Sequence, residues 1–171
     1  MEDAFDLLAG DHEEIRQMLS ELEKGPTLAT GATEDQLMLR SMMTEELIIE
    51  ERKHEAAELR CFWPAVRERV AGGDELADRA ICQEIEITEL LKELSRLDAS
   101  DARFEDVLGR FIKAGREHFD FEESRVWPGL RAALTPKAVG ELGLAIFRVK
   151  SAQNAQPGRV SPPMGASASP E

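Results

Sequence analysis

The chain has no tyrosine and only two cysteines and three histidines among its 171 residues. The absence of tyrosine excludes a tyrosyl radical and a tyrosinate metal ligand. Two cysteines, Cys61 and Cys82, do not make a disulfide framework, so we expect a reducing, cytoplasmic setting. In that setting both are expected to be small buried apolar residues.

Basic charge and long apolar runs are also scarce. The chain has 21 Lys and Arg residues against 34 Asp and Glu residues, which gives a net charge of −13 at pH 7. This balance, with no basic block, argues against nucleic acid and anionic lipid as partners. No apolar run approaches the roughly 20 residues of a membrane span. The acidic N-terminus MEDAFDLL is unlike an export signal, so we expect no membrane association.

One segment is present twice. Residues 54–67 read HEAAELRCFWPAVR and residues 118–131 read HFDFEESRVWPGLR. At one constant offset the following residues coincide: His54 and His118, Glu58 and Glu122, Trp63 and Trp127, Pro64 and Pro128, and Arg67 and Arg131. Each copy contains His-x-x-x-Glu, which places an imidazole and a carboxylate one turn apart on the same face of a helix.

A weaker repeat surrounds this one. The segment LLAGDHEEIRQMLSEL, residues 7–22, can be aligned with AICQEIEITELLKEL, residues 80–94. Apolar residues then coincide, and His12 falls opposite Glu84. With only two copies, the pattern indicates a duplicated helix pair rather than a solenoid. One helix of each pair carries a single potential ligand, and the other carries two.

Apolar residues at helical spacing predict five helices, over about residues 3–23, 34–63, 74–97, 102–127 and 136–150. Breakers such as Gly25-Pro26 and Gly72-Gly73 separate them. Pro64 is expected to kink the second helix or to begin a short further segment. The predicted fold class is all-α: an antiparallel up-down four-helix bundle with a short C-terminal fifth helix, as one domain over residues 1–150. Residues 151–171 lack large apolar side chains and are predicted to form a disordered tail.

The two His-x-x-x-Glu units should point into the bundle, because His54 and Glu58 share a helix face with Leu47 and Cys61. An unpaired buried carboxylate or imidazolium costs several kcal/mol. Two cations remove that cost, since a carboxylate can bridge both and each imidazole can bind one. The predicted metal ligands are His12, His54, Glu58, Glu84, His118 and Glu122. Imidazole and carboxylate donors suit iron, manganese or zinc, and the lack of thiolate donors argues against a zinc finger.

Several alternatives are open. A single buried histidine is often a hydrogen-bonded core residue, and the metal could be merely structural. A ferritin-like centre needs Glu-x-x-His on two helices; Glu51 and His54 provide this once, but Gly115 stands at the equivalent position in the second copy. Glu50 and Glu51 are candidates for a further ligand or a hydrogen-bond partner, and Cys61 for a redox relay. The zinc-protease signature fails, because HEAAE lacks its second histidine.

The chain resembles the hemerythrin-like (HHE cation-binding) family, and most closely its bacterial branch of stand-alone proteins, over residues 3–150. The resemblance rests on DLLAGDHEEI, HEAAELRCFWPAVR, ELADRAICQEIEI and EHFDFEESRVWPGLR. It implies a non-haem di-iron centre, oxo- or hydroxo-bridged, held inside the bundle by the six residues named above, with manganese or zinc less favoured. The family's usual ligand on the third helix is histidine, whereas this chain has Glu84.

The shortage of histidine bears on function. Oxygen-carrying members of the family hold five histidines, and this chain contains three. A carboxylate in place of an imidazole lowers the potential and favours the ferric state, which disfavours reversible oxygen carriage. We therefore expect catalase-like decomposition of hydrogen peroxide, an activity that the resemblance also implies. The alternative is a protein that binds or senses oxygen, nitric oxide or iron without turnover, with a separate protein partner that the sequence does not identify.

Overall fold

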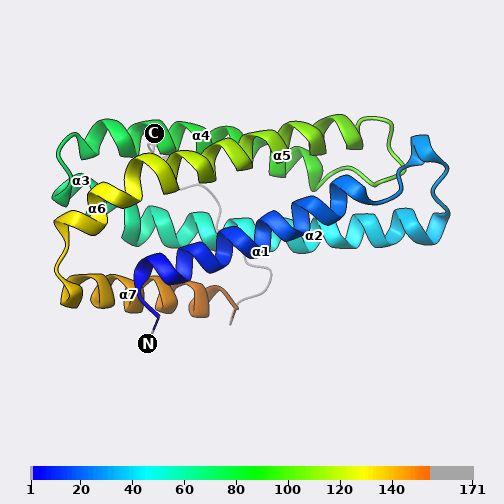
Figure 1. Cartoon of the computed structure of the whole chain (residues 1–171). Helices are drawn as coiled ribbons and strands as arrows, with labels where there is room; N and C mark the ends of the chain where they lie inside the picture. The colour runs from blue at the N-terminus through cyan, green and yellow to red at the C-terminus, as the bar shows by residue number, and fades with distance from the viewer. Residues whose placement is uncertain (1, 155–171) are drawn as a thin grey trace, which may run out of the picture.

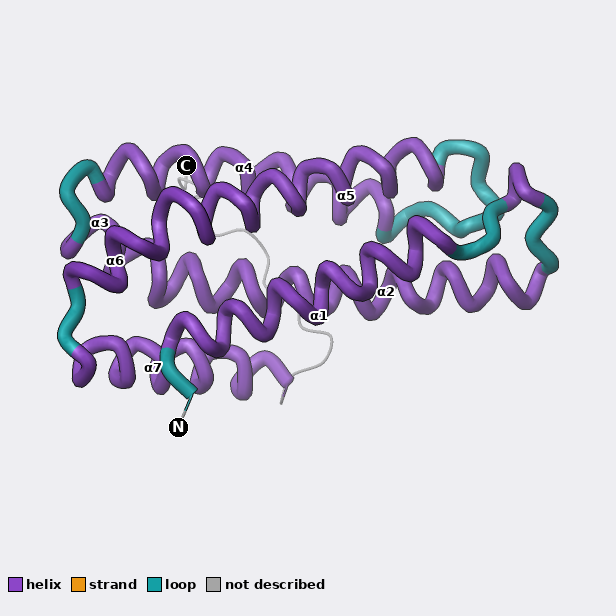
Figure 2. Tube along the Cα trace, in the orientation of Figure 1, coloured by secondary structure: helices purple, strands orange, loops and turns teal. Residues whose placement is uncertain are grey.

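The computed structural model describes residues 2–154 and shows four long helices packed as a bundle, with a fifth helix along one side (Figure 1). The bundle helices are α1 (Ala4–Lys24), α2 (Glu34–Ala57), α4 (Gly73–Leu94) and α5 (Phe104–Phe121). Consecutive bundle helices run in opposite directions, and the connecting loops lie at the two ends (Figure 2). No strand occurs between residues 2 and 154. The predicted all-α bundle with a fifth helix, α7 (Pro136–Asn154), is confirmed.

Local signals set the helix ends. The Asp3 carboxylate accepts hydrogen bonds from the backbone N–H groups of Phe5 and Asp6 at the start of α1, and Thr33 caps α2 in a similar way. The turn before α4 requires glycine twice. Gly72 has a left-handed φ of 72°, and a Cβ on Gly73 would lie 2.1 Å from the carbonyl oxygen of Val66.

The second predicted helix, expected to reach Trp63 or beyond, and the fourth, expected to reach Trp127, are helical over those lengths, but the α-helices α2 and α5 themselves end at Ala57 and Phe121. Each passes into a π-helical turn, η2 (Glu58–Phe62) and η3 (Glu122–Val126), and then into a short helix, α3 (Trp63–Arg69) and α6 (Trp127–Ala133). Hydrogen bonds in a π turn span five residues, so the helix accommodates one extra residue. Glu58 and Trp63, five residues apart, can therefore both face the interior, where they are 0% and 1% exposed. Pro64 lies in the first turn of the short helix α3, in line with the second of the two outcomes expected for it.

Three further expectations need correction. Helix α4 ends at Leu94 rather than near Leu97. Helix α7 continues to Asn154, so the first residues of the predicted tail are helical; residues 155–171, the remainder of that tail, lie outside the described residues. Cys82 is exposed and Cys61 only partly buried, because neither lies on the innermost face of its helix.

The core consists of two apolar clusters. One fills the end of the bundle near the loops that follow α1 and α4, with Leu19, Leu47 and Phe111 among its residues. The other joins α3, α6 and α7 to the opposite end and includes Phe5 and Phe62. Each large side chain buried in these clusters contributes roughly 1.5–3 kcal/mol. A polar layer lies between them. None of the described helices has the length and apolar character that a bilayer span requires.

Helix α7 packs along α1 and α2 (Figure 1). Ile146 faces this contact and is fully buried. Gly143 permits the close approach to α1, because a Cβ at this position would lie 2.8 Å from the backbone nitrogen of Ala4. One turn away on the same helix, a Cβ on Gly140 would meet nothing within 4 Å.

These two glycines test the docking of α7. Gly143→Ala should lower the free energy of unfolding by about 1–3 kcal/mol, because the added methyl group collides with backbone. Gly140→Ala should raise it by about 0.4–1 kcal/mol, because alanine restricts the unfolded chain. Urea unfolding of the metal-free protein measures both. Equal changes in the two variants would contradict the packing of α7 on α1.

Candidate metal centre

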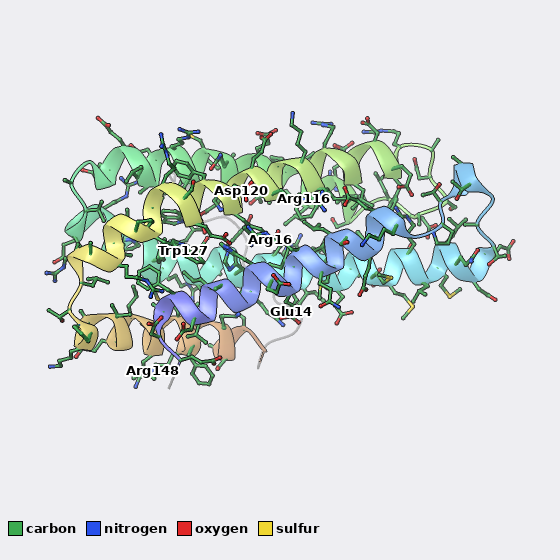
Figure 3. All side chains as sticks on the ribbon, in the orientation of Figure 1. Glu14, Arg16, Arg116, Asp120, Trp127 and Arg148 are labelled. Carbon is green, nitrogen blue, oxygen red and sulfur yellow. The ribbon has the colours of Figure 1, made fainter. Side chains whose placement is uncertain are left out.

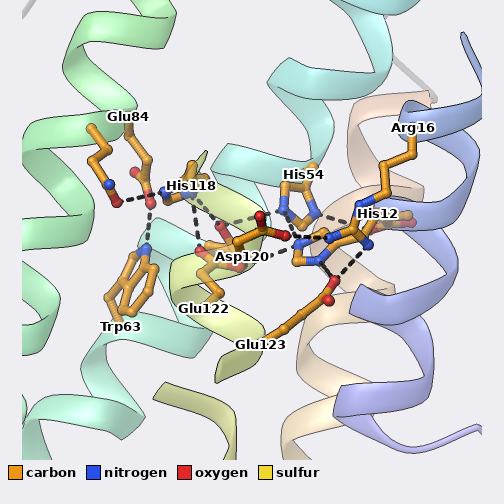
Figure 4. A network of polar contacts seen from close by, with 12 residues as sticks. His12, Arg16, His54, Trp63, Glu84, His118, Asp120, Glu122 and Glu123 are labelled. Atoms are coloured by element: carbon orange, nitrogen blue, oxygen red, sulfur yellow. Dashed lines mark hydrogen bonds and ion pairs between the residues drawn. The ribbon is translucent and has the colours of Figure 1, made fainter. Parts of the chain in front are cut away.

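Six buried side chains meet in the polar layer, and they are the six that the sequence predicted. They are His12 from α1, His54 from α2, Glu84 from α4, His118 from α5, and Glu58 and Glu122, the first residues of the two π turns. None of them is more than 3% exposed. The close view in Figure 4 labels five of them, which converge from different helices: His12, His54, Glu84, His118 and Glu122.

The six residues form two overlapping groups. In donor group 1, His12, His54, Glu58 and Glu122 each offer one atom, and these four atoms lie within 4.8 Å of one another. In donor group 2, Glu58, Glu84, His118 and Glu122 do the same. Glu58 and Glu122 belong to both groups. The arrangement could hold two cations that share the two glutamates.

Many atoms of the cluster are buried without a hydrogen-bond partner among the described residues. They are both carboxylate oxygens of Glu58 and of Glu122, Oε2 of Glu84 and Nε2 of His118. An unsatisfied buried atom costs about 1–3 kcal/mol, and more if it is charged. Ion pairs offset part of this cost, because His118 Nε2 lies 3.0 Å from Glu122 Oε1 and His12 Nε2 lies 3.2 Å from Glu122 Oε2. Glu58 Oε1 and Glu84 Oε2 have no such partner among the described residues. Cations among these atoms would satisfy them, so the residues fit a pair of metal ions.

The orientation of the two group 1 imidazoles supports the same conclusion. His12 Nδ1 lies 2.7 Å from Glu123 Oε1, and His54 Nδ1 lies 3.2 Å from Asp11 Oδ2. A carboxylate only accepts hydrogen bonds, so both Nδ1 atoms donate. In the neutral rings both Nε2 atoms then carry lone pairs, and these atoms are 3.2 Å apart. Two lone pairs facing each other need a proton or a cation between them.

Basic side chains hold the carboxylates of Glu123 and Asp11, which accept hydrogen bonds from these imidazoles. Arg16 donates from Nη1 to Glu123 Oε1 at 2.7 Å and lies 3.4 Å from Asp120; Figure 3 shows Arg16 and Asp120 between α1 and α5. Lys150 of α7 pairs with Asp11. The fifth helix therefore reaches His54 through one intervening carboxylate.

Donor group 2 has different neighbours. His118 Nδ1 donates to the amide oxygen of Gln83 at 3.2 Å, and the indole N–H of Trp63 donates to Glu84 Oε1. Sequence reasoning missed these partners. The alignment that matches His12 with Glu84 also matches Asp11 with Gln83, and that correspondence was the available signal.

Aromatic rings enclose His12. Its ring stacks on Phe119 with centroids 4.1 Å apart and on Trp127 with centroids 5.1 Å apart. Trp127 corresponds in the repeat to Trp63, which contacts Glu84. Trp63, which follows α2, thus contacts Glu84 of α4, and Trp127, which follows α5, contacts His12 of α1.

Burial and mutual charge shift the pKa values of the cluster. Burial alone would lower the pKa of His54, but the carboxylate of Glu58 and its neighbours raise it to about 10. The pKa of His118 is raised well above its usual value in the same way, chiefly by Glu122. Burial raises the pKa of Glu84 to about 8. In the metal-free protein, protons on these groups provide the compensation that cations would otherwise give.

The remaining candidates lie outside the two donor groups. Glu51 is buried, its Oε1 has no hydrogen-bond partner within the described part of the chain, and burial raises its pKa to about 7. Glu55, which the sequence did not single out, is also buried, and burial raises its pKa to about 7. Glu50 pairs with Lys53. Burial raises the pKa of the Cys61 thiol, which disfavours the reactive thiolate and gives no support to a redox relay.

Comparison with known proteins identifies the family of the chain. The family model of the hemerythrin HHE cation binding domain matches residues 3–130, which include all six donors but not α7. The crystal structure of a hemerythrin HHE cation binding domain-containing protein from Mycobacterium kansasii is similar, with a TM-score of 0.73 and 22% identity over 91% of this chain and 90% of that chain. At this identity the likeness concerns the fold. No curated protein matches the chain. Because the family model covers most of its length, the chain belongs to the hemerythrin HHE cation-binding family.

Proposed function

We propose that the chain binds two iron ions in donor groups 1 and 2, with Glu58 and Glu122 shared between them, and that the loaded protein decomposes hydrogen peroxide. The observation that carries the proposal is the buried set of three imidazoles and three carboxylates with unsatisfied atoms facing one another. This mixture of donors suits iron, and manganese or zinc less well.

The choice of reaction follows from Glu84. Bound iron supplies redox chemistry by changing its oxidation state. A carboxylate in the position where the family usually has histidine adds negative charge and favours the ferric state, so reversible oxygen carriage is disfavoured. Two molecules of hydrogen peroxide give two of water and one of oxygen, so the reaction needs no external reductant.

The residues of the chain would hold the two ions and orient the side chains that bind them. Glu58 and Glu122, which belong to both donor groups, would hold both ions, and hydrogen bonds at Nδ1 orient the rings of His12 and His54. The apolar clusters on both sides keep bulk water from the layer, which strengthens every charge interaction inside it.

Metal content tests the binding step. Iron-loaded protein should contain two ions per chain, and Glu58→Gln or Glu122→Gln should contain one or none, because each removes a carboxylate shared by both groups. Glu86→Gln is the matched control, since Glu86 lies on α4 two residues from Glu84 but is exposed. Elemental analysis and the visible spectrum measure the effect. Two ions retained in the Glu58 and Glu122 variants would refute the ligand set.

Oxygen evolution tests the reaction. Iron-loaded protein given excess peroxide should release oxygen over many equivalents, and Glu58→Gln should fall to the level of metal-free protein because it no longer holds the pair of ions that the reaction needs. Glu86→Gln should keep its rate. If colour instead bleaches after about one equivalent and oxygen release stops, the protein binds or senses its ligand without turnover, and the catalase-like proposal is wrong.

A further inference from the structure

The two halves of the duplication supply equivalent donors of unequal chemistry. Apart from the shared glutamates, donor group 1 has two imidazoles, His12 and His54. Donor group 2 has one imidazole, His118, and the carboxylate of Glu84. Group 1 is therefore richer in nitrogen, and group 2 is richer in oxygen.

The groups that accept hydrogen bonds from the imidazole Nδ1 atoms also differ between donor groups 1 and 2. Both group 1 imidazoles donate to carboxylates, Glu123 and Asp11, which raises the basicity of the opposite ring nitrogen. The group 2 imidazole donates to the neutral amide of Gln83. At the position equivalent to Glu123, the first copy has Leu59, which is 49% exposed. The duplication has thus kept the ligand positions and changed the groups behind them.

We infer that the two cation positions are unequal: when divalent ions other than the proposed iron are offered, donor group 1 binds Co²⁺ or Zn²⁺ more tightly than donor group 2 does, and donor group 2 is the position that accepts Mn²⁺. This inference rests on the proposed binding of two cations. Basic imidazoles favour ions late in the divalent series, whereas carboxylates suit manganese. Asp11 and Glu123 are positioning residues of the first site, and Gln83 is the positioning residue of the second.

The equivalence of Asp11 and Gln83 provides a reciprocal experiment. Calorimetric titration of the metal-free protein with Co²⁺ should show two steps, the tighter at donor group 1. Asp11→Asn should weaken the first step by roughly 10- to 100-fold and leave the second unchanged. Gln83→Glu should strengthen the second step alone, since it places a carboxylate behind His118. Glu86→Gln, on the same helix but exposed, should change neither step.

Mixed loading tests the choice of ion. Protein holding one equivalent of Co²⁺ should take up one equivalent of Mn²⁺, and the electron paramagnetic resonance spectrum of that Mn²⁺ should be broadened by the neighbouring Co²⁺. Two equal Co²⁺ steps, displacement of Co²⁺ by Mn²⁺, or an Asp11→Asn change that weakens both steps alike would overturn the inference while leaving two-cation binding intact. Fewer than two ions bound by the unaltered chain would overturn the proposed function as well.

Discussion

The structure depends on one requirement: the negative charge buried inside the apolar bundle must be neutralised. Five glutamates and three histidines, none more than 8% exposed, lie in or beside one layer: Glu51, Glu55, Glu58, Glu84, Glu122, His12, His54 and His118. An isolated carboxylate in such surroundings is too costly to persist. With no cation bound, the raised pKa values of Glu84 and His54 favour their protonated forms, which reduces the buried negative charge. The helices and apolar clusters of the described residues position this layer.

Helix packing and hydrogen bonding achieve that positioning at two levels. Apolar clusters above and below hold the four bundle helices in register, so the donors come from rigid elements rather than loops. Around the donors, Arg16 and Lys150 hold the carboxylates of Glu123 and Asp11, which orient His12 and His54. Lys150 comes from α7, beyond residues 3–130 of the family match. The appended helix therefore contributes to the centre as well as to the core.

The sequence predicted the bundle and all six clustered residues, because a duplicated pattern shows which polar positions share a face with apolar ones. It did not predict the π turns, since the need for Glu58 and Trp63 both to face inward arises only when the helices pack. The partners Asp11, Gln83 and Glu123 were missed for a related reason. Each lies next to a ligand in the chain but bonds to a histidine of another helix, so its role depends on which helix stands opposite.

The π turns also belong to the repeat. Each begins at the glutamate of a His-x-x-x-Glu unit and ends just before a Trp-Pro pair. A π turn amounts to one residue added to an α-helix. Since both copies hold it at the same place, the likeness of the repeat extends from its residues to the backbone around its two glutamates.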